Sequence, residues 1–225
     1  MNTYVLADGF SAFFSPYISY FSDNTSRFII ALREHLLLSG EALLAAGVAG
    51  VFFGILCGKN KTLNNIITGF FSAARIIPSL AILFLCLPIL GTGVAPSIAA
   101  LTFLAAPPIL INTAASFAQI PKAMVEAACA MGMTPAQIFF RIKAPLALPL
   151  ILAGFKTAAV EIIASATLAA YIGGGGLGVI IFTGLGLMKT ELLVIGGVSV
   201  ALLSLLTDFL LSILEKKLRV YLYGA

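Results

Sequence analysis

A polar stretch interrupts the apolar chain at residues 120–145, which read Ile120-Pro-Lys-Ala-Met-Val-Glu126-Ala-Ala-Cys-Ala-Met-Gly132-Met-Thr-Pro135-Ala-Gln-Ile-Phe-Phe-Arg141-Ile-Lys143-Ala-Pro145. Its alanine-rich first half predicts a short helix that ends at Gly132. Thr134 and Pro135 supply an N-cap and a first-turn proline for a second helix over 136–142, and Pro145 is expected to close the unit. The 120–145 loop is therefore predicted to be two short helices joined at a glycine.

The 120–145 loop also carries the basic residues Lys122, Arg141 and Lys143. Such a compact basic unit suits docking onto a soluble partner on the cytoplasmic side of a membrane. An ordinary solvated cytoplasmic loop is the simpler interpretation that its composition leaves open.

The composition places the rest of the chain in a bilayer. Of the 225 residues, 60% are hydrophobic and 10% charged, and the mean hydropathy is +1.10. A soluble domain carries about 25% charged residues. The net charge of +4 is dispersed along the chain, which argues against nucleic-acid binding. The three cysteines show no metal-ligand spacing and are interpreted as unpaired packing residues.

Five segments are long and apolar enough to cross a bilayer, whose hydrocarbon core takes about 20 helical residues. They lie approximately at 36–57, 64–90, 95–118, 146–172 and 192–214. The second and fourth are long for a simple span, so we expect tilt or a kink at Pro78 or Pro88. The predicted fold is an all-α membrane protein.

The basic residues predict the orientation of these spans. Of the 13 Lys and Arg residues, eight fall on the side of the 120–145 loop: Lys59, Lys61, Lys122, Arg141, Lys143, Lys216, Lys217 and Arg219. Three, Arg27, Arg33 and Lys189, fall on the other side, and Arg75 and Lys156 lie within spans. The positive-inside rule then puts the N-terminus outside and the C-terminus in the cytoplasm.

Residues 1–34 are rich in aromatic side chains but are interrupted by Pro16 and by Ser22-Asp23-Asn24. Aromatic residues favour the headgroup level, so this segment is predicted to be interfacial or extracytoplasmic rather than spanning. No basic segment precedes an apolar core here, so we expect no cleaved signal peptide. The chain thus divides into this segment, a transmembrane domain over 35–218 that contains the 120–145 loop, and a cytoplasmic tail over 219–225.

The spacing of Glu126-Ala-Ala, Gly132, Ile142 and Pro145 resembles the EAA loop of bacterial ABC-importer permeases of type I, which have the MetI-like fold. The pattern departs at Ala144, where the family usually has leucine. Residues 77–81, 145–154 and 166–178 resemble the branch that transports the osmoprotectants glycine betaine, choline and carnitine. Together the resemblance covers roughly residues 36–215.

This resemblance implies a multi-pass permease in the bacterial inner membrane that moves solute by alternating access and is not itself an enzyme. It implies separate cytoplasmic ATPase subunits that bind ATP and magnesium, an extracytoplasmic binding protein, and a second permease copy, identical or paralogous. No cofactor is expected in this chain. Amino acids or another small solute are the alternative substrates, and an ATP-independent channel or secondary transporter is the alternative class.

The resemblance assigns coupling to the ATPase to six residues of the 120–145 loop: Glu126, Ala127, Ala128, Gly132, Ile142 and Pro145. Glu126 and Gly132 would fix the shape and contacts of the loop, which would pass movement to the spans as a rigid lever.

Ionisable residues inside spans need partners or water. They are Glu41, Arg75, Lys156, Glu161 and Asp208. Lys156 and Glu161 are five residues apart on one helix, a poor spacing for a direct pair, so we expect partners on other helices. We predict that Arg75 meets Glu161. Structural bracing, pathway lining and snorkelling to headgroups remain open as roles.

The run Gly173-Gly-Gly-Gly176 lacks the Lys-Ser or Lys-Thr of a phosphate loop. Glycines permit positive φ, so this run is predicted to end the fourth span and redirect the chain at the outer face. By resemblance it contributes to the outer gate, although a plain connector is an alternative. The pathway and gate candidates are Arg75, Pro78, Glu161, Tyr171, Gly173, Gly174, Gly175 and Gly176.

Aromatic rings could hold a quaternary ammonium solute by cation–π contact. Phe70, Phe71, Phe84 and Tyr171 could make weak contacts of this kind, although packing is the commoner role of such residues. His35, the only histidine, is interpreted as an interfacial anchor, and no metal site or hydrolytic motif is found.

Overall fold

The computed structural model describes residues 2–58 and 61–223, and within these ranges every regular element is a helix. The elements are α1 Asn2–Cys57, α2 Lys61–Ala74, α3 Ser79–Leu90, α4 Val94–Ala118, α5 Lys122–Ala130, α6 Pro135–Ile138, α7 Ala144–Ala169, α8 Gly178–Gly186 and α9 Thr190–Tyr223. A π-helical turn, η1 Phe139–Lys143, precedes α7, and a 3-10 turn, η2 Ala170–Ile172, follows it. The prediction of an all-helical fold is confirmed.

The predicted spans correspond to these helices, with one of them broken. Four helical stretches are long and apolar enough to cross a membrane: Ser15–Cys57, Val94–Ala118, Pro135–Ile172 and Thr190–Val220. The second predicted span is a helix pair, Asn64–Ala74 and Ser79–Leu90, bent by 96°. The expected kink therefore lies at Pro78, where the missing N–H and fixed φ favour a new helix start. Pro88 lies inside α3.

The core forms where α4 packs between α1 and α7. Small residues on α1 allow close approach of the helix backbones. A Cβ added at Gly50 would lie 2.8 Å from Ile109 Cβ, and one at Gly54 would lie 2.5 Å from Thr113 Cβ. The small-residue face of the first span therefore packs within the subunit, against α4.

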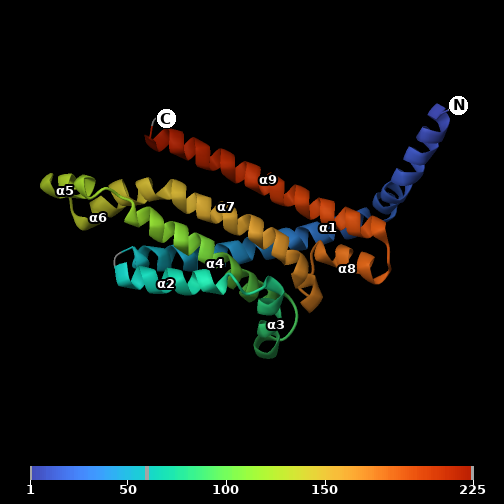
Figure 1. Cartoon of the computed structure of the whole chain (residues 1–225), viewed down its shortest axis with the longest axis horizontal. Helices are drawn as coiled ribbons and strands as arrows, with labels where there is room; N and C mark the ends of the chain where they lie inside the picture. The colour runs from blue at the N-terminus through green and yellow to red at the C-terminus, as the bar shows by residue number, and fades with distance from the viewer. Residues whose placement is uncertain (1, 59–60, 224–225) are drawn as a thin grey trace.

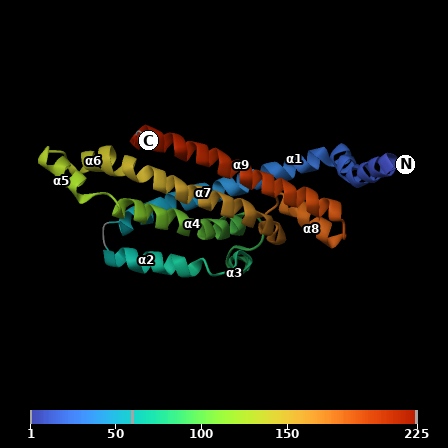
Figure 2. The ribbon, with the colours of Figure 1, turned by 45° about the horizontal axis from the view of Figure 1, so that its top comes forward.

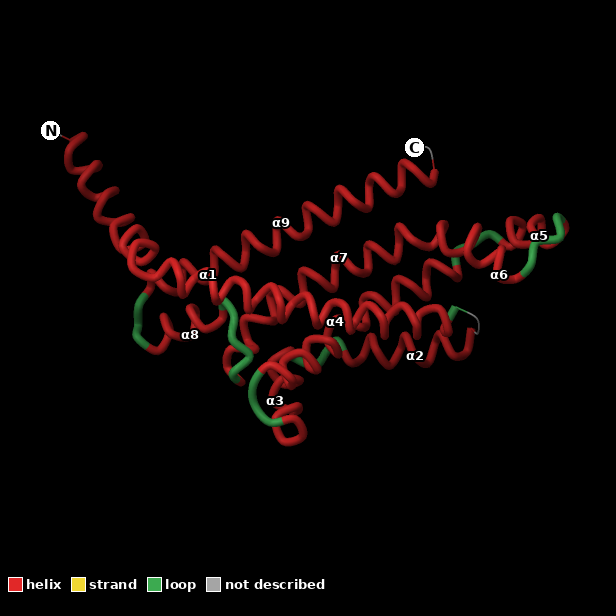
Figure 3. Tube along the Cα trace, turned by 180° about the vertical axis from the view of Figure 1, so that it is seen from behind, coloured by secondary structure: helices red, strands yellow, loops and turns green. Residues whose placement is uncertain are grey.

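The long helices α4, α7 and α9 run roughly alongside the C-terminal half of α1, whereas α3 turns away from α2. The two chain ends lie toward opposite ends of the bundle (Figures 1 and 2). The 120–145 loop, with α5 and α6, projects at one end, and the C-terminal end of α9 lies toward the same end. The N-terminus, α8 and the glycine run lie toward the opposite end (Figure 3). This sorting agrees with an odd number of crossings, and the orientation of the termini across the membrane stays a prediction.

The N-terminal segment differs in detail from the expected broken stretch. Helix α1 passes through Pro16 without a break, and its kink lies at Asn24, whose φ of −125° and ψ of 15° are not helical. Beyond this kink the helix runs on past residue 34 to Cys57. The division of the chain at residues 34 and 218, and the interfacial role of the first segment, stay predictions.

Candidate functional site

The first helix of the 120–145 loop ends as its sequence predicts. Helix α5 ends at Ala130, and Gly132 has a φ of +75°. The N–H of Gly132 donates to the Cys129 carbonyl at 3.0 Å, and the N–H of Met133 donates to the Ala128 carbonyl at 3.1 Å. This pair of bonds is a Schellman motif, which needs a left-handed residue at the Gly132 position.

The second helix begins as predicted, with a capping box. The Thr134 hydroxyl accepts from the Gln137 N–H at 3.3 Å, and the Gln137 side chain accepts from the Thr134 N–H at 2.8 Å. Pro135 occupies the first turn, where its missing N–H costs nothing. The turn between α5 and α6 is therefore fixed by backbone hydrogen bonds at its first end and by side-chain-to-backbone hydrogen bonds at its second.

Pro145 does not close the unit, and this expectation is wrong. Helix α6 continues through the π-helical turn η1 into α7, so that residues 135–172 form one helical stretch. Pro145 sits in the first turn of α7, directly after η1. The proline lacks the N–H that would complete an α-helical ladder, and the preceding π turn accommodates this gap by changing the hydrogen-bond register.

The coupling candidates in this loop divide by exposure. Ala128, on α5, is fully buried, and Ile142 and Pro145 are half-buried. Glu126, Ala127 and Gly132 are exposed. Within the described part of the chain, Glu126 has no hydrogen bond or ion pair, so its carboxylate is available to a partner.

The loop also presents large apolar side chains that sequence reasoning did not single out. Met124, Met131 and Phe140 are exposed at its surface. Phe139 stacks on Phe117 of α4, with ring centroids 5.8 Å apart and planes 5° from parallel. The loop is thus held against α4 at its base and exposes large apolar side chains as well as Glu126. The presence of large apolar residues in a loop with charged and polar residues could have indicated, from the sequence alone, an apolar contact surface.

The predicted contact between Arg75 and Glu161 is confirmed. Arg75 lies in the break between α2 and α3, and its Nη2 is 3.8 Å from Glu161 Oε2 on α7. The Glu161 Oε2 atom is buried and has no hydrogen-bond donor among the described residues. The side chains are 42% and 27% exposed, so the pair is a loose, partly exposed ion pair. Its role in a pathway stays a prediction.

The glycine run makes the turn that was predicted for it. Gly173 caps η2 in the left-handed conformation, with φ of +84°, and Gly175 and Gly176 have φ of +77° and +82°. The N–H of Gly93 donates to the Ile172 carbonyl at 2.7 Å, which ties the start of α4 to this turn. The chain then enters α8, so the predicted outer segment after the run begins as a short helix.

Comparison with known proteins assigns the family. The model of the binding-protein-dependent transport system inner membrane component matches residues 50–220. The chain belongs to this family. It is therefore a permease subunit of an ABC importer and resides in the inner membrane.

Individual relatives match the permease over most of their length. The carnitine transport permease protein OpuCB of Listeria monocytogenes is 37% identical over 89% of this chain and 92% of the relative. The choline transport system permease protein OpuBB of Bacillus subtilis is 36% identical, over 89% and 93% respectively. The glycine betaine/carnitine/choline permease OpuCB of the same species is 35% identical, over 89% and 92%.

Solved structures share the fold of the permease. An inward-facing MetNI methionine ABC transporter matches with a TM-score of 0.75 at 24% identity, covering 85% of this chain and 95% of that chain. An amino acid ABC transporter with histidines matches with a TM-score of 0.73 at 20% identity, covering 91% and 98%. The prediction of a MetI-like, type I importer fold is confirmed.

Two residues toward the end of the bundle opposite the 120–145 loop were missed or misread from the sequence. Glu34 Oε2 accepts a hydrogen bond from the Gly176 N–H at 3.0 Å. His35 is fully buried, and its Nε2 donates to the Ile163 carbonyl of α7 at 3.0 Å. The interpretation of His35 as an interfacial anchor is therefore wrong. Helix α1 holds both α7 and the glycine run through this pair.

The available signal for His35 was its helical position. Ala31, Leu38, Ala42 and Ala46 follow helical spacing around His35 and all are buried. A polar residue on the apolar stripe of a helix has to find a hydrogen-bond partner inside the fold. The charged residues Arg33 and Glu34 precede His35 directly, and they made the segment look polar and interfacial.

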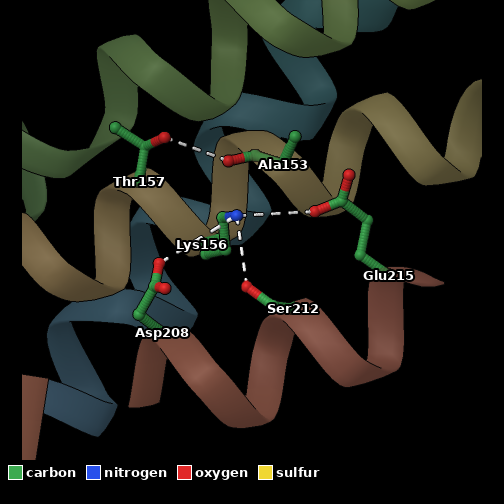
Figure 4. A network of polar contacts seen from close by, with 6 residues as sticks. All are labelled: Ala153, Lys156, Thr157, Asp208, Ser212 and Glu215. Atoms are coloured by element: carbon green, nitrogen blue, oxygen red, sulfur yellow. Dashed lines mark hydrogen bonds and ion pairs between the residues drawn. The ribbon is translucent and has the colours of Figure 1, made fainter. Parts of the chain in front are cut away.

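Lys156 has its partners on another helix, as predicted (Figure 4). Its Nζ lies 3.7 Å from Glu215 Oε2, 4.0 Å from Asp208 Oδ1 and 3.3 Å from Ser212 Oγ, all on α9. These three residues recur at helical spacing, so they present one face of α9 to α7. The apolar helices α7 and α9 are thus joined by a polar clasp, defined as Lys156, Asp208, Ser212 and Glu215.

An open pocket of about 630 Å³ lies at the end of the bundle opposite the 120–145 loop, between the N-terminal half of α1 and the segment from α8 to α9. Charged side chains of both signs line it, together with Tyr20: Asp23, Arg27, Glu34, Lys189 and Glu191. Glu34 therefore faces this pocket as well as the glycine run.

Proposed function

We propose that this permease is the membrane subunit of an ATP-driven importer for small quaternary ammonium osmoprotectants, namely glycine betaine, choline and carnitine. The observation that carries the proposal is the extent of its likeness to permeases for these solutes, 35–37% identity over 89% of the chain. These solutes share a trimethylammonium group.

The 120–145 loop is the proposed contact with the ATPase. It projects from one end of the bundle, it is capped at Gly132 and Thr134, and it exposes the carboxylate of Glu126, which has no partner among the described residues. Each permease would engage one cytoplasmic ATPase subunit, and ATP and magnesium would be bound there rather than by this chain. The chain itself would catalyse no reaction.

The opposite end of the permease is the proposed contact with an extracytoplasmic binding protein. The 630 Å³ pocket there is lined by charges of both signs, which suits a polar and transient protein interface. Docking of the loaded binding protein at this pocket would shift the conformation of the glycine run, because Glu34 lines the pocket and is hydrogen-bonded to Gly176.

Transport would then proceed by alternating access. A second permease copy, identical or paralogous, would complete the pathway. Closure of the ATPase dimer would move the 120–145 loops, and α7 would carry the movement to the glycine run because residues 135–172 are one helical stretch. The pathway would open outward, accept the solute and reset inward after hydrolysis.

The test is uptake of radiolabelled glycine betaine, choline and carnitine into proteoliposomes that contain the permease with its ATPase and the loaded binding protein. Uptake should require ATP on the ATPase side. Uptake that is independent of ATP would instead support a channel or secondary transporter, and uptake of amino acids alone would overturn the substrate class.

A glycine substitution tests coupling in the same assay. Gly132→Ala strains the positive φ of the loop although open space surrounds the site, so uptake should fall at least tenfold. Gly69→Ala is the matched control, because Gly69 on α2 also has open space but has no positive φ. Equal activity of both variants would show that the loop geometry does not transmit ATPase movement.

A further inference from the structure

Three aromatic rings from three separate elements meet beside the glycine run. Phe84 of α3 and Tyr171 of η2 have ring centroids 6.1 Å apart at an interplanar angle of 85°. Tyr171 and Phe182 of α8 have centroids 4.9 Å apart at 80°. These three residues are called the aromatic cluster. The end of α7 lies between α3 and α8 in all three views (Figures 1, 2 and 3).

The aromatic cluster is not part of the packed core. Tyr171 is 62% exposed and Phe84 is 41% exposed. Ala169 and Ile172, on either side of Tyr171, are buried. The backbone around Tyr171 is therefore anchored in the fold while its ring is held outward.

The position of Tyr171 is fixed from two directions. The 3-10 turn that contains it ends in the left-handed cap at Gly173. The Ile172 carbonyl, one residue on, accepts the N–H of Gly93 at 2.7 Å. A ring held in place by its own backbone loses little conformational entropy when it binds a ligand.

The rings of the aromatic cluster leave most of one another's faces uncovered. In an edge-to-face pair the edge of one ring covers one face of the other. Two such contacts join the three rings, so most of their faces are not covered by one another. The free faces carry the negative end of the ring quadrupole, which attracts a cation.

A quaternary ammonium group fits these faces better than other solute groups do. Its methyl groups cannot donate a conventional hydrogen bond, so proteins hold it by cation–π contact. The solutes named for the relatives of this permease, carnitine, choline and glycine betaine, all carry such a group.

We infer that the aromatic cluster of Phe84, Tyr171 and Phe182 is a binding site in the permease for the trimethylammonium group of the transported solute. This inference rests on the proposed substrate class. Because Tyr171 closely precedes the glycine run, a cation on its ring lies beside the turn that ends α7. The site would receive the solute at the outer end of the permease, after release from the binding protein.

The first test compares uptake by variants of the assembled transporter at saturating loaded binding protein. Tyr171→Leu should lower the maximal rate of choline uptake about tenfold, since it removes the central ring. Tyr171→Phe keeps the ring and should retain most of that rate. Phe52→Leu is the matched control, because Phe52 on α1 is a similarly exposed ring in an edge-to-face pair that lies elsewhere.

The second test detects the cation directly on the full-length permease in lipid nanodiscs, without the binding protein. The chain contains no tryptophan, so Tyr171→Trp introduces a single fluorescent reporter. Its emission should change in a saturable way with tetramethylammonium and with choline. It should not respond to equal concentrations of 3,3-dimethylbutan-1-ol, the uncharged carbon analogue of choline, or to sodium. Phe52→Trp should respond to none of them.

The outcomes separate this inference from the proposed function. If the unsubstituted transporter takes up none of the three solutes, the proposed substrate class fails. If it takes them up and Tyr171→Leu is as active as the control, or the Tyr171→Trp variant does not distinguish tetramethylammonium from the uncharged analogue, only the aromatic site fails. Equal loss in Tyr171→Phe and Tyr171→Leu would also overturn it, because the ring would then not be the active feature.

Discussion

At the residue scale, the Arg75–Glu161 pair shows what a charge inside an apolar segment requires. Both residues lie within predicted spans, and each has the other as its ion-pair partner. Their separation of 3.8 Å is too long for a hydrogen bond, so the attraction is mainly coulombic. Each side chain therefore depends on the other's charge.

Charge reversal tests that dependence. Arg75→Glu or Glu161→Arg should lower the free energy of unfolding by about 1–3 kcal/mol, because two like charges would then face each other. The double variant restores opposite charges and should recover most of the loss. Thermal unfolding in nanodiscs and uptake rates provide the measurements. Losses that simply add in the double variant would contradict a functional pair.

His35 is the second residue with a specific expectation. His35→Ala removes the donor to the buried Ile163 carbonyl and leaves a small cavity between α1 and α7. The lost hydrogen bond and the cavity together should lower the free energy of unfolding by about 1–3 kcal/mol, so the unfolding midpoint should fall. Leu36→Ala, at the exposed neighbouring position, should change it little. Equal effects of the two substitutions would show that the buried hydrogen bond contributes nothing.

At the element scale, helix ends and helix contacts differ in how far the sequence predicts them. The end of α5 at Gly132 and the start of α6 at Thr134 follow local rules, because caps depend on residues within one turn. Local rules do not predict that the helix continues past Pro145. The helix continues because the π turn η1 shifts the backbone hydrogen bonds from i→i+4 to i→i+5 just before the proline. The apolar stripe of α1 could indicate that His35 is buried, but its partner Ile163 could be found only from the packing of α1 on α7. The 96° bend at Pro78 could be located but not measured in advance.

The contact between α1 and α4 leads to a prediction about small residues. Gly54→Ala places a Cβ 2.5 Å from Thr113 Cβ, so the helices must separate, and the free energy of unfolding should fall by about 1–3 kcal/mol. Gly40→Ala lies on the same helix with open space around it and should be neutral or slightly stabilising. Equal stability of both variants in thermal unfolding would contradict the close packing.

The polar clasp leads to a prediction about α9. Lys156→Met leaves Asp208 and Glu215 without their cation, and the unfolding midpoint should fall more than in Ser212→Ala, which removes only a hydroxyl. Lys156→Arg keeps the charge and should stay close to the unsubstituted permease. A Lys156→Met variant as stable as Lys156→Arg would show that the clasp does not hold α9.

At the scale of the whole molecule, the sorting of charges and chain ends predicts an orientation that native cysteines can report. Cys129 is exposed on α5 in the 120–145 loop, whereas Cys57 is buried. A membrane-impermeant maleimide should label Cys129 in inverted membrane vesicles but not in right-side-out vesicles. Assembly with the ATPase should protect it. Labelling from the outer side would overturn the predicted orientation, and Cys129→Ser identifies the labelled site.

The single helical stretch from Pro135 to Ile172 spans 38 residues, about 57 Å at the helical rise, and η1 is its one departure from regular geometry before the 3-10 end. Deleting one residue within η1 would restore an α-helical register. The stretch would shorten by only about 1.5 Å, but everything on the loop side would rotate by about 100° relative to the span. The direction in which the loop points is thus set almost independently of its distance from the membrane. A single residue lost or gained at this turn would point Glu126 in a different direction and leave the membrane-spanning part of the helix intact.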